Sequence, residues 1–192
     1  IKQFDLAAVS RSAASFNYEK LYWLNQHYQK SDHPNDVAKA LQHHFDEANI
    51  DVREGPALAD IVRIQGERCK TLAEMAEKST YFYTETVVLD EAAVKKQLRP
   101  VALAPLEALY QAFKALDVWD KDALQACIND VCAQFDVGMG KIAQPLRVAI
   151  TGGSNSPAID MTLMLIGKSR VMARLDVALA RIRARAAGDS ES

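Results

Sequence analysis

Glycine, lysine and serine occur at two places where they could bind phosphate. Residues 152–153 are Gly-Gly after an apolar run, and residues 167–169, Gly-Lys-Ser, match the end of a phosphate-binding loop. That loop requires another glycine five residues before Gly167, and Thr162 stands there. An apolar helical segment, not a strand, precedes the tripeptide. We therefore interpret Gly167 as the end of one helix and predict no nucleotide site there.

Metal-ligand side chains gather at residues 43–47, His-His-Phe-Asp-Glu. The H-E-x-x-H spacing of zinc proteases is absent. On a helix, His43 and Glu47 would lie one turn apart and form a surface pair, so we predict no metal site. An all-α, metal-dependent enzyme that uses His43 and His44 is the alternative, and it would require bound metal.

Nucleophilic side chains do not form a recognisable catalytic group in this sequence. No serine lies in a nucleophile elbow, and no cysteine has a histidine nearby in sequence, so we predict no catalytic residue. The cysteines are odd in number, and we interpret them as buried free thiols of a protein in the reducing cytoplasm: Cys69, Cys127 and Cys132.

Aromatic and amide side chains crowd residues 15–28, SFNYEKLYWLNQHY. Rings that stack on bases, and amides that meet sugars and phosphates, are typical of RNA-binding surfaces. The alternative is structural: Trp23 and Leu24 would pack in the core and the other side chains would surround them.

A second polar cluster lies at residues 63–77, where Arg63, Arg68 and Lys70 surround Gly66 at a break between helices. An arginine held on a bend can donate two parallel hydrogen bonds to a base edge. The alternative is an exposed, charged corner.

Helices must position these groups, because apolar residues recur at helical spacing along nearly the whole chain. Helix starts are expected at Asn17, at Pro34, near Pro56, at Lys70 or Thr71, and at Asp120. Residues 81–89 form a connector. Short loops between amphipathic helices predict an all-α bundle or cage. Apolar stripes of further helices cover 106–113, 124–135, 142–150 and 171–182.

The loop at residues 151–157 is expected to join two helices. Thr151 and Gly152 would end the first, although Pro145 should limit or bend it, and Ser156 and Pro157 would begin the second as N-cap and first helical residue. Asp160 would then suit the helix dipole. The same carboxylate would repel a phosphate, so we expect this loop to meet bases more than backbone.

Charge and composition limit the possible functions. The formal net charge of −2 argues against a generally basic nucleic-acid binder. No apolar run approaches the roughly 20 residues of a membrane helix, so we predict no membrane segment. The last helix, however, carries six basic residues and one acid: Lys168, Arg170, Arg174, Arg181, Arg183 and Arg185 against Asp176. Its basic face would be solvated or would contact a phosphate backbone.

Several motifs occur in an order that resembles the C-terminal part of bacterial glutamyl-tRNA synthetases. They are FDLAAVSRSAASFNYEKLYWLN at 4–25, ERCKTLAEMAE at 67–77 before YFY, and the stretch VGMGKIAQPLRVAITGGSNSPAIDMTLMLIGKSRVMARL at 137–175. The resemblance covers essentially the whole chain. Its most specific segment is 140–175, which contains P-L-R, T-G, S-P and G-K-x-R in order.

This resemblance implies the edge of a stem-contact region at 1–30 and two helical anticodon-binding subdomains at 31–86 and 87–187. The tail at 188–192, Gly-Asp-Ser-Glu-Ser, is expected to be disordered. The family's HIGH-like and KMSKS-like motifs are absent, so the chain should lack the catalytic domain, and ATP and Mg²⁺ would belong to the full-length enzyme. Because Ile1 is not an initiator methionine, we expect a fragment or a processed product. The expected partner is glutamate tRNA and not DNA, and the expected state is a cytoplasmic monomer.

The resemblance also assigns roles to individual residues. Arg68 would read the third anticodon base, which separates glutamate from glutamine tRNAs. The other anticodon-binding residues would be Arg147, Ser156, Pro157 and Ile159, with Ser156 and Ile159 where threonine and leucine also occur. The stem or backbone contacts would be Lys20, Trp23 and Asn25. The alternative is a protein of a different class: a free-standing, non-catalytic helical module, derived from the synthetase, that binds RNA or a protein.

Overall fold

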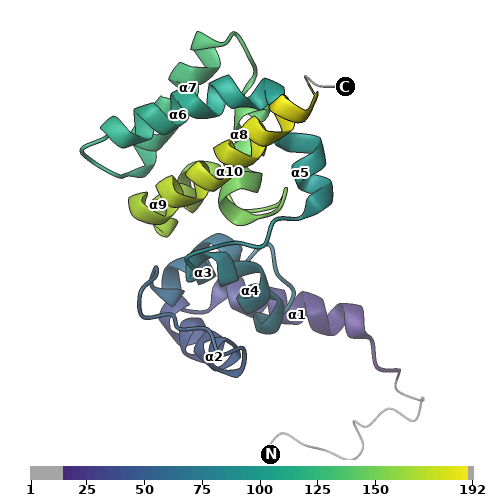
Figure 1. Ribbon diagram of the computed structural model, residues 1–192. Helices are drawn as coiled ribbons and strands as arrows, with labels where there is room; N and C mark the ends of the chain where they lie inside the picture. The colour runs from purple at the N-terminus through teal and green to yellow at the C-terminus, as the bar shows by residue number, and fades with distance from the viewer. Residues whose placement is uncertain (1–14, 190–192) are drawn as a thin grey trace, which may run out of the picture.

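The computed structural model describes residues 15–189, which contain helices and no strand. The helices form two bodies joined by residues 83–90 (Figure 1). The predicted all-α class is confirmed. The first body contains α1 (Tyr18–Ser31), α2 (Pro34–Glu47), α3 (Leu58–Gln65), α4 (Leu72–Ser79) and the 3₁₀ turn η2 (Thr80–Phe82). The second contains α5 (Glu91–Gln97), the 3₁₀ turn η3 (Pro100–Ala102), α6 (Leu103–Ala115), α7 (Lys121–Gln134), α8 (Met139–Thr151), α9 (Ile159–Ile166) and α10 (Lys168–Asp189).

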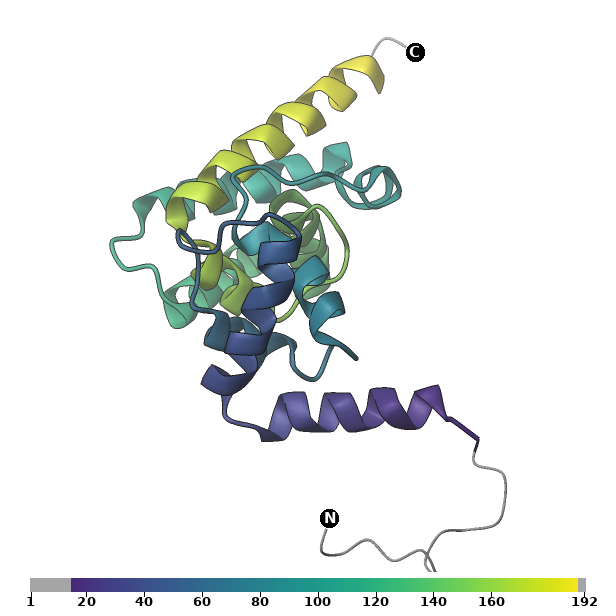
Figure 2. The ribbon, with the colours of Figure 1, turned by 90° about the horizontal axis from the view of Figure 1, so that it is seen from below.

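The first body is built around α2, which packs against both α3 and α4. Leu41, Phe45, Ile61 and Met75 are fully buried between these helices. Helix α1 also contacts α2 and α3, but most of its surface is open, and it lies across one end of the molecule in Figure 2. Trp23 is 62% exposed, so the expectation that it could be a core residue is wrong. The apolar face of α2, not the aromatics of α1, supplies this core.

The second body is built around α10, which packs on α6, α8 and α9. The apolar stripe that predicted α10 is buried throughout, with Val171, Leu175 and Ile182 fully enclosed. Helix α7 covers α6, α8 and α9, and α5 covers α8. Helix α10 continues to Asp189, although we expected a disordered tail to begin after Ala187. The rest of that tail, 190–192, lies outside the described residues, as do residues 1–14 of the predicted stem-contact edge.

Helix ends follow the capping chemistry of the sequence. The side chains of Asn17, Thr71 and Asp120 each accept a hydrogen bond from the backbone N–H three residues later, and Pro34 is the first residue of α2. These starts are confirmed, whereas the third helix begins at Leu58, two residues past Pro56. Helix α8 runs through Pro145 without ending there. Gly152 and Gly167, both with positive φ, end α8 and α9 as expected.

One predicted start is wrong. Helix α9 begins at Ile159, after Ala158, and not at Ser156 and Pro157. The reason is that the hydroxyl and carbonyl of Ser156 and the carbonyl of Pro157 accept hydrogen bonds from Arg147, so Ser156 does not cap α9. Asp160 lies in the first turn of α9, as expected.

Arg174 of α10 joins the two bodies. The residue is 4% exposed. Its guanidinium donates to the carbonyls of Tyr81 and Thr84 on one side, at 2.7 and 2.5 Å, and to the carbonyl of Ile150 on the other, at 2.7 Å. Arg170 likewise donates to the carbonyl of Glu54 at 2.6 Å and to the carboxylate of Glu85 at 2.7 Å. We expected the basic residues of the last helix to face solvent or phosphate. All six of them instead bind carbonyls or carboxylates of the chain itself: Lys168, Arg170, Arg174, Arg181, Arg183 and Arg185.

Candidate functional site

Arg68 lies on a corner between α3 and α4 whose backbone is fixed by local hydrogen bonds. The Arg68 N–H donates to the Gln65 carbonyl at 2.8 Å. At the start of α4, Thr71 Oγ1 accepts from the Glu74 N–H at 3.1 Å, and Glu74 Oε2 accepts from the Lys70 N–H at 2.6 Å. Thr71 thus caps α4, and Glu74 pairs with the N–H of the residue before the cap, so both side chains satisfy backbone donors and hold the corner at the start of the helix.

Helix α1 fastens the same corner from the other side. Gln26 Nε2 donates to the Glu67 carbonyl at 2.8 Å, and Asn25 Nδ2 donates to the Lys70 carbonyl at 3.2 Å. A Cβ at Gly66 would lie 2.9 Å from the Val62 carbonyl oxygen of α3 but at an ordinary contact distance, 3.5 Å, from the Gln29 carbonyl oxygen of α1, so the turn at the end of α3 favours glycine here. Asn25, predicted to contact the tRNA stem, therefore also holds the Arg68 corner in place.

The loop after α8 provides the opposite wall of the site. Gly152 has a φ of 85°, and its carbonyl accepts a hydrogen bond from the Asp90 N–H at 2.8 Å, so the loop is tied to the connector between the two bodies. Thr151 Oγ1 donates to the Arg147 carbonyl at 2.9 Å and lies 3.2 Å from the carbonyl of Gly153. Together these bonds set where Asn155 and Ser156 lie.

Arg147 braces this loop from beneath. Its Nη1 donates to the carbonyls of Ser156 and Pro157, at 2.9 and 2.7 Å, and also contacts the Ser156 hydroxyl. Burial lowers the pKa of the Arg147 guanidinium from its ordinary value, with the nearby Arg68 adding in the same direction. Its bonds to this loop show that Arg147 shapes the wall of the site.

A cavity of about 310 Å³ lies between these two walls. Arg68 Nη2 reaches across to Asn155 Oδ1 at 2.6 Å, in a hydrogen bond that spans the two bodies. Most of the donors of the Arg68 fork remain available, because the guanidinium has five. The cavity is lined by Gln65, Arg68, Glu77, Tyr81, Asn155 and Ser156, among others.

Tyr81 contributes a polar group that the sequence analysis did not identify as functional. Tyr81 lines the cavity, and its hydroxyl oxygen is buried with no hydrogen-bond partner among the described residues. Burial raises the pKa of the phenol, so it is neutral at physiological pH and can donate a proton. A buried, unpaired hydroxyl costs about 1–3 kcal/mol, which makes it a candidate for pairing with a ligand. No local signal could have revealed it, since its isolation depends on packing.

The structure brings only some of the predicted residues together. Arg68 and Ser156 line the cavity, and Arg147 lies behind Ser156. Pro157 and Ile159 are buried and are absent from the cavity lining. Lys20 and Trp23 lie on α1, outside the cavity, where the Trp23 ring stacks on His27 with centroids 5.6 Å apart.

Other possible sites are not supported within residues 15–189. No group of three or more His, Cys, Asp or Glu side chains there could hold a metal ion. His43 and Glu47 form the expected surface pair at 3.3 Å. None of the helices from α1 to α10 combines the length and apolar content needed to cross a lipid bilayer.

Comparison with known proteins decides the family. A family described as "Anticodon binding domain" matches residues 36–179, most of the chain. The chain belongs to this anticodon-binding family.

The curated relatives are glutamate–tRNA ligases. Those of Legionella pneumophila strains Corby and Lens are each 61% identical over 186 residues, which is 97% of this chain and 40% of the relative. The chain thus spans about two fifths of the length of these relatives. The resemblance to glutamyl-tRNA synthetases seen in the sequence is confirmed.

Solved structures give the same match. A glutamate tRNA ligase from Elizabethkingia meningosepticum CCUG26117, in complex with its amino acid, is 26% identical with a TM-score of 0.82 and covers 94% of this chain and 36% of its own. A glutamate-tRNA synthetase from Elizabethkingia anophelis is 26% identical with a TM-score of 0.77, at 93% and 35% coverage.

Proposed function

We propose that this chain is the tRNA-binding part of a glutamate–tRNA ligase and that it selects glutamate tRNA by its anticodon. The observation that carries the proposal is the cavity between the two bodies, with Arg68 on one wall and the loop at Asn155 on the other. Both walls are rigidly supported, and the groups that face the cavity are hydrogen-bond donors and acceptors. Unstacked bases are recognised by such groups.

Arg68 is the proposed reader of the third anticodon base. That base is cytosine in glutamate tRNAs and guanine in glutamine tRNAs, because their codons begin with G and C. The Watson–Crick edge of cytosine offers two adjacent acceptors, O2 and N3, which match the parallel donors of a guanidinium. Guanine offers one acceptor and two donors on that edge, so an arginine would face unpaired donors.

Tyr81 and Asn155 complete the proposed pocket. The buried hydroxyl of Tyr81 is free to bind a polar atom of the base. Asn155 Oδ1 accepts a hydrogen bond from one donor of the Arg68 guanidinium. When a base enters, it would displace the Asn155 side chain or share that donor with it.

The remaining predicted residues have supporting roles in this proposal. Arg147 holds Ser156 and Pro157 so that the edge of the loop meets the other anticodon bases, with Ile159 packed beneath. Lys20 and the exposed Trp23 of α1 meet the tRNA stem, and Asn25 holds α1 against the corner. The two subdomains, divided near residue 86, grip the anticodon between them.

The activity proposed for the whole ligase is the esterification of its tRNA with glutamate, using ATP and Mg²⁺. In this proposal the chain supplies recognition and no catalytic residue. It acts as a monomer in the cytoplasm, where its cysteines stay reduced; the described thiols are free, and burial raises the pKa of Cys69.

A titration of the chain with RNA tests the proposal. We expect glutamate tRNA to bind better than an unrelated tRNA, with an affinity that falls as salt rises because phosphate contacts release counterions. No binding at low salt, or equal binding of unrelated tRNAs, would contradict the proposal.

A further inference from the structure

Most cationic side chains of the described residues are engaged by the chain itself. Arginines bind carboxylates or carbonyls, as Arg181 binds Glu91 at 2.7 Å and Arg185 binds the Leu98 carbonyl at 2.9 Å. Lysines behave similarly, as Lys78 with Glu74. Within residues 15–189, six cationic side chains make no ion pair or side-chain hydrogen bond: Lys20, Lys95, Lys96, Arg99, Lys114 and Lys141.

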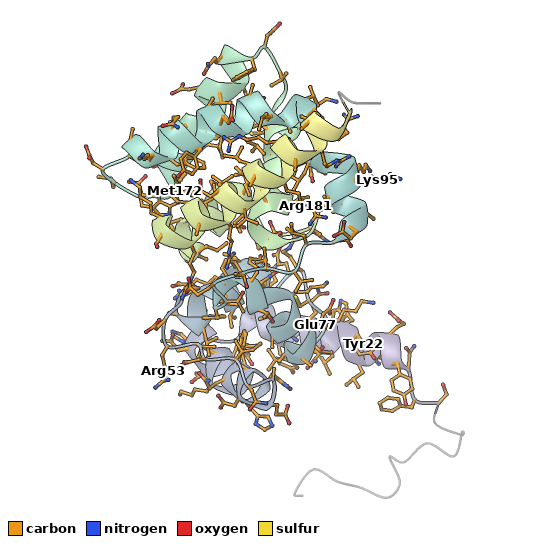
Figure 3. The ribbon with its side chains drawn as sticks, in the orientation of Figure 1. Tyr22, Arg53, Glu77, Lys95, Met172 and Arg181 are labelled. Carbon is orange, nitrogen blue, oxygen red and sulfur yellow. The ribbon has the colours of Figure 1, made fainter. Side chains whose placement is uncertain are left out.

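Three of these six lie together, and we call them the cation patch: Lys96, Arg99 and Lys141. Lys96, Arg99 and Lys141 line a pocket of about 250 Å³ between α5, η3 and the start of α8. No acidic side chain lines it. Lys95 extends from α5 away from the body of the molecule (Figure 3). Glu91, one turn before Lys95, is held by Arg181.

The cation patch is continuous with the candidate site along one face of α8. Gly140, Gln144, Arg147 and Thr151 follow at spacings of four, three and four residues, which places them on one side of a helix. All other α8 residues between Lys141 and Thr151 are buried. Gly140 lines the pocket of the cation patch, and Thr151 lines the Arg68 cavity. Gln144, Arg147 and Thr151 are half-buried, and at 1.5 Å per residue this face is about 16 Å long.

We propose that the cation patch binds backbone phosphates of the same RNA whose anticodon bases enter the Arg68 cavity. This inference rests on the proposed function. The two ends of α8 then divide the work: bases are read at the end near Thr151, and phosphates are bound at the end near Lys141. The chain has a net charge of −2, so unpaired cations gathered in one place provide a local attraction that the whole surface does not.

The form of the patch fits a repeated anion better than a single one. Its cations come from α5, from the turn after it and from α8, so they are spread along a surface instead of converging on one point. Successive phosphates of a strand offer charges spread in the same way. Phosphate contacts set position and affinity but carry no base information, so the patch should strengthen binding of any anticodon alike.

The test compares two variants with the same change of charge. One carries Lys96→Gln, Arg99→Gln and Lys141→Gln; the control carries Lys39→Gln, Arg53→Gln and Lys114→Gln, at exposed positions away from the patch. Each is titrated with glutamate tRNA over a range of salt concentrations. We expect the patch variant to bind at least tenfold more weakly than the control at low salt. The slope of log affinity against log salt should fall by about 0.7 per lost contact, or about two in all.

The outcomes separate this inference from the proposed function. Discrimination between anticodons should stay unchanged in the patch variant. If the patch variant and the control have the same slope and affinity while the unmodified chain still discriminates, the inference is wrong and the proposed function stands. If the unmodified chain binds no tRNA, both are wrong. Thermal unfolding checks that each variant is folded. If the triple patch variant does not fold, the double variant Lys96→Gln, Lys141→Gln replaces it and is judged by the same salt slope.

Discussion

Arg174 of α10 and Arg68 beside the cavity both lie next to the junction of the two bodies, but their surroundings differ. Arg174 is enclosed, and its donors meet the carbonyls of Ile150, Tyr81, Thr84 and Glu85. Arg68 is exposed and gives one donor to Asn155. Burial lowers the pKa of Arg174 to about 10, so it stays charged at neutral pH.

The contrast shows how to separate binding arginines from structural ones. A buried guanidinium whose donors are mostly matched by the protein has little left for a ligand, whereas an exposed one with most of its donors free can bind a ligand in the cavity. The basic sequence of α10 suggested a phosphate contact, but its arginines stabilise the fold.

Arg174→Ala should cause the largest loss of stability. The change would leave several buried carbonyls without a donor, at about 1–3 kcal/mol each, so we expect at least about 3 kcal/mol less unfolding free energy. Denaturant unfolding measures it. Arg183→Ala on the same helix is the control, because its pair with Glu107 is exposed and should contribute less than about 1 kcal/mol. Equal losses would contradict the distinction between the two kinds of arginine.

Gly152→Ala should destabilise the wall of the cavity. A Cβ there would lie 2.2 Å from the Val88 carbonyl oxygen, and the φ of 85° disfavours alanine. We expect a loss of about 2 kcal/mol from strain and displacement of the connector. Gly153→Ala is the matched control, since its Cβ would meet nothing within 4 Å. Thermal unfolding of both variants should separate them by several degrees; the same melting temperature would show that the loop adjusts freely.

Tyr81→Phe should weaken RNA binding without weakening the fold. Its hydroxyl has no partner among the described residues, so removing it should leave the unfolding free energy unchanged or raise it by up to about 1 kcal/mol. Affinity for glutamate tRNA should fall about fivefold, as expected for one hydrogen bond of about 1 kcal/mol. A loss of stability with unchanged affinity would instead assign the hydroxyl a structural role.

Glu74→Gln should have the smallest effect, and it should depend on pH. Hydrogen bonds from Lys78 and from the Lys70 N–H lower the pKa of the Glu74 carboxyl below its ordinary value of 4.5. The carboxylate therefore stabilises the folded state above pH 4.5, and this contribution is lost as the pH falls through the lowered pKa. Urea unfolding at neutral pH should show a difference below about 1 kcal/mol that disappears in acid. A difference independent of pH would contradict this origin.

The sequence predicted the helical elements well because their signals are local. Each of the capping residues Asn17, Thr71 and Asp120 stands directly before an apolar stripe, and each caps the helix that follows. The apolar stripe of α10 is buried, as its helical spacing predicts. The prediction for Ser156 failed because a distant side chain, Arg147, took the cap's acceptor. The spacing of residues around a helix start does not show whether another side chain will bind the capping group first.

The site was only partly predictable for the same reason. The Arg68 corner is visible as basic residues around a glycine, and the family resemblance points to Arg68 directly. The isolation of the Tyr81 hydroxyl and the four hydrogen bonds of Arg174 depend on residues far away in sequence, so no pattern revealed them. Which cations are free, as in the cation patch, likewise depends on the fold.

The most direct test of the central claim pairs one residue with one base. Wild type, Arg68→Gln and the control Arg63→Gln, an exposed arginine paired with Asp60, are titrated with two glutamate tRNAs that carry cytosine or guanine as the third anticodon base. We predict that wild type and the control favour cytosine by about 1–3 kcal/mol, roughly 5- to 150-fold, by analogy with direct readout in DNA, and that Arg68→Gln loses most of this preference. An unchanged preference in Arg68→Gln would contradict the assignment of Arg68 as the reader of that base.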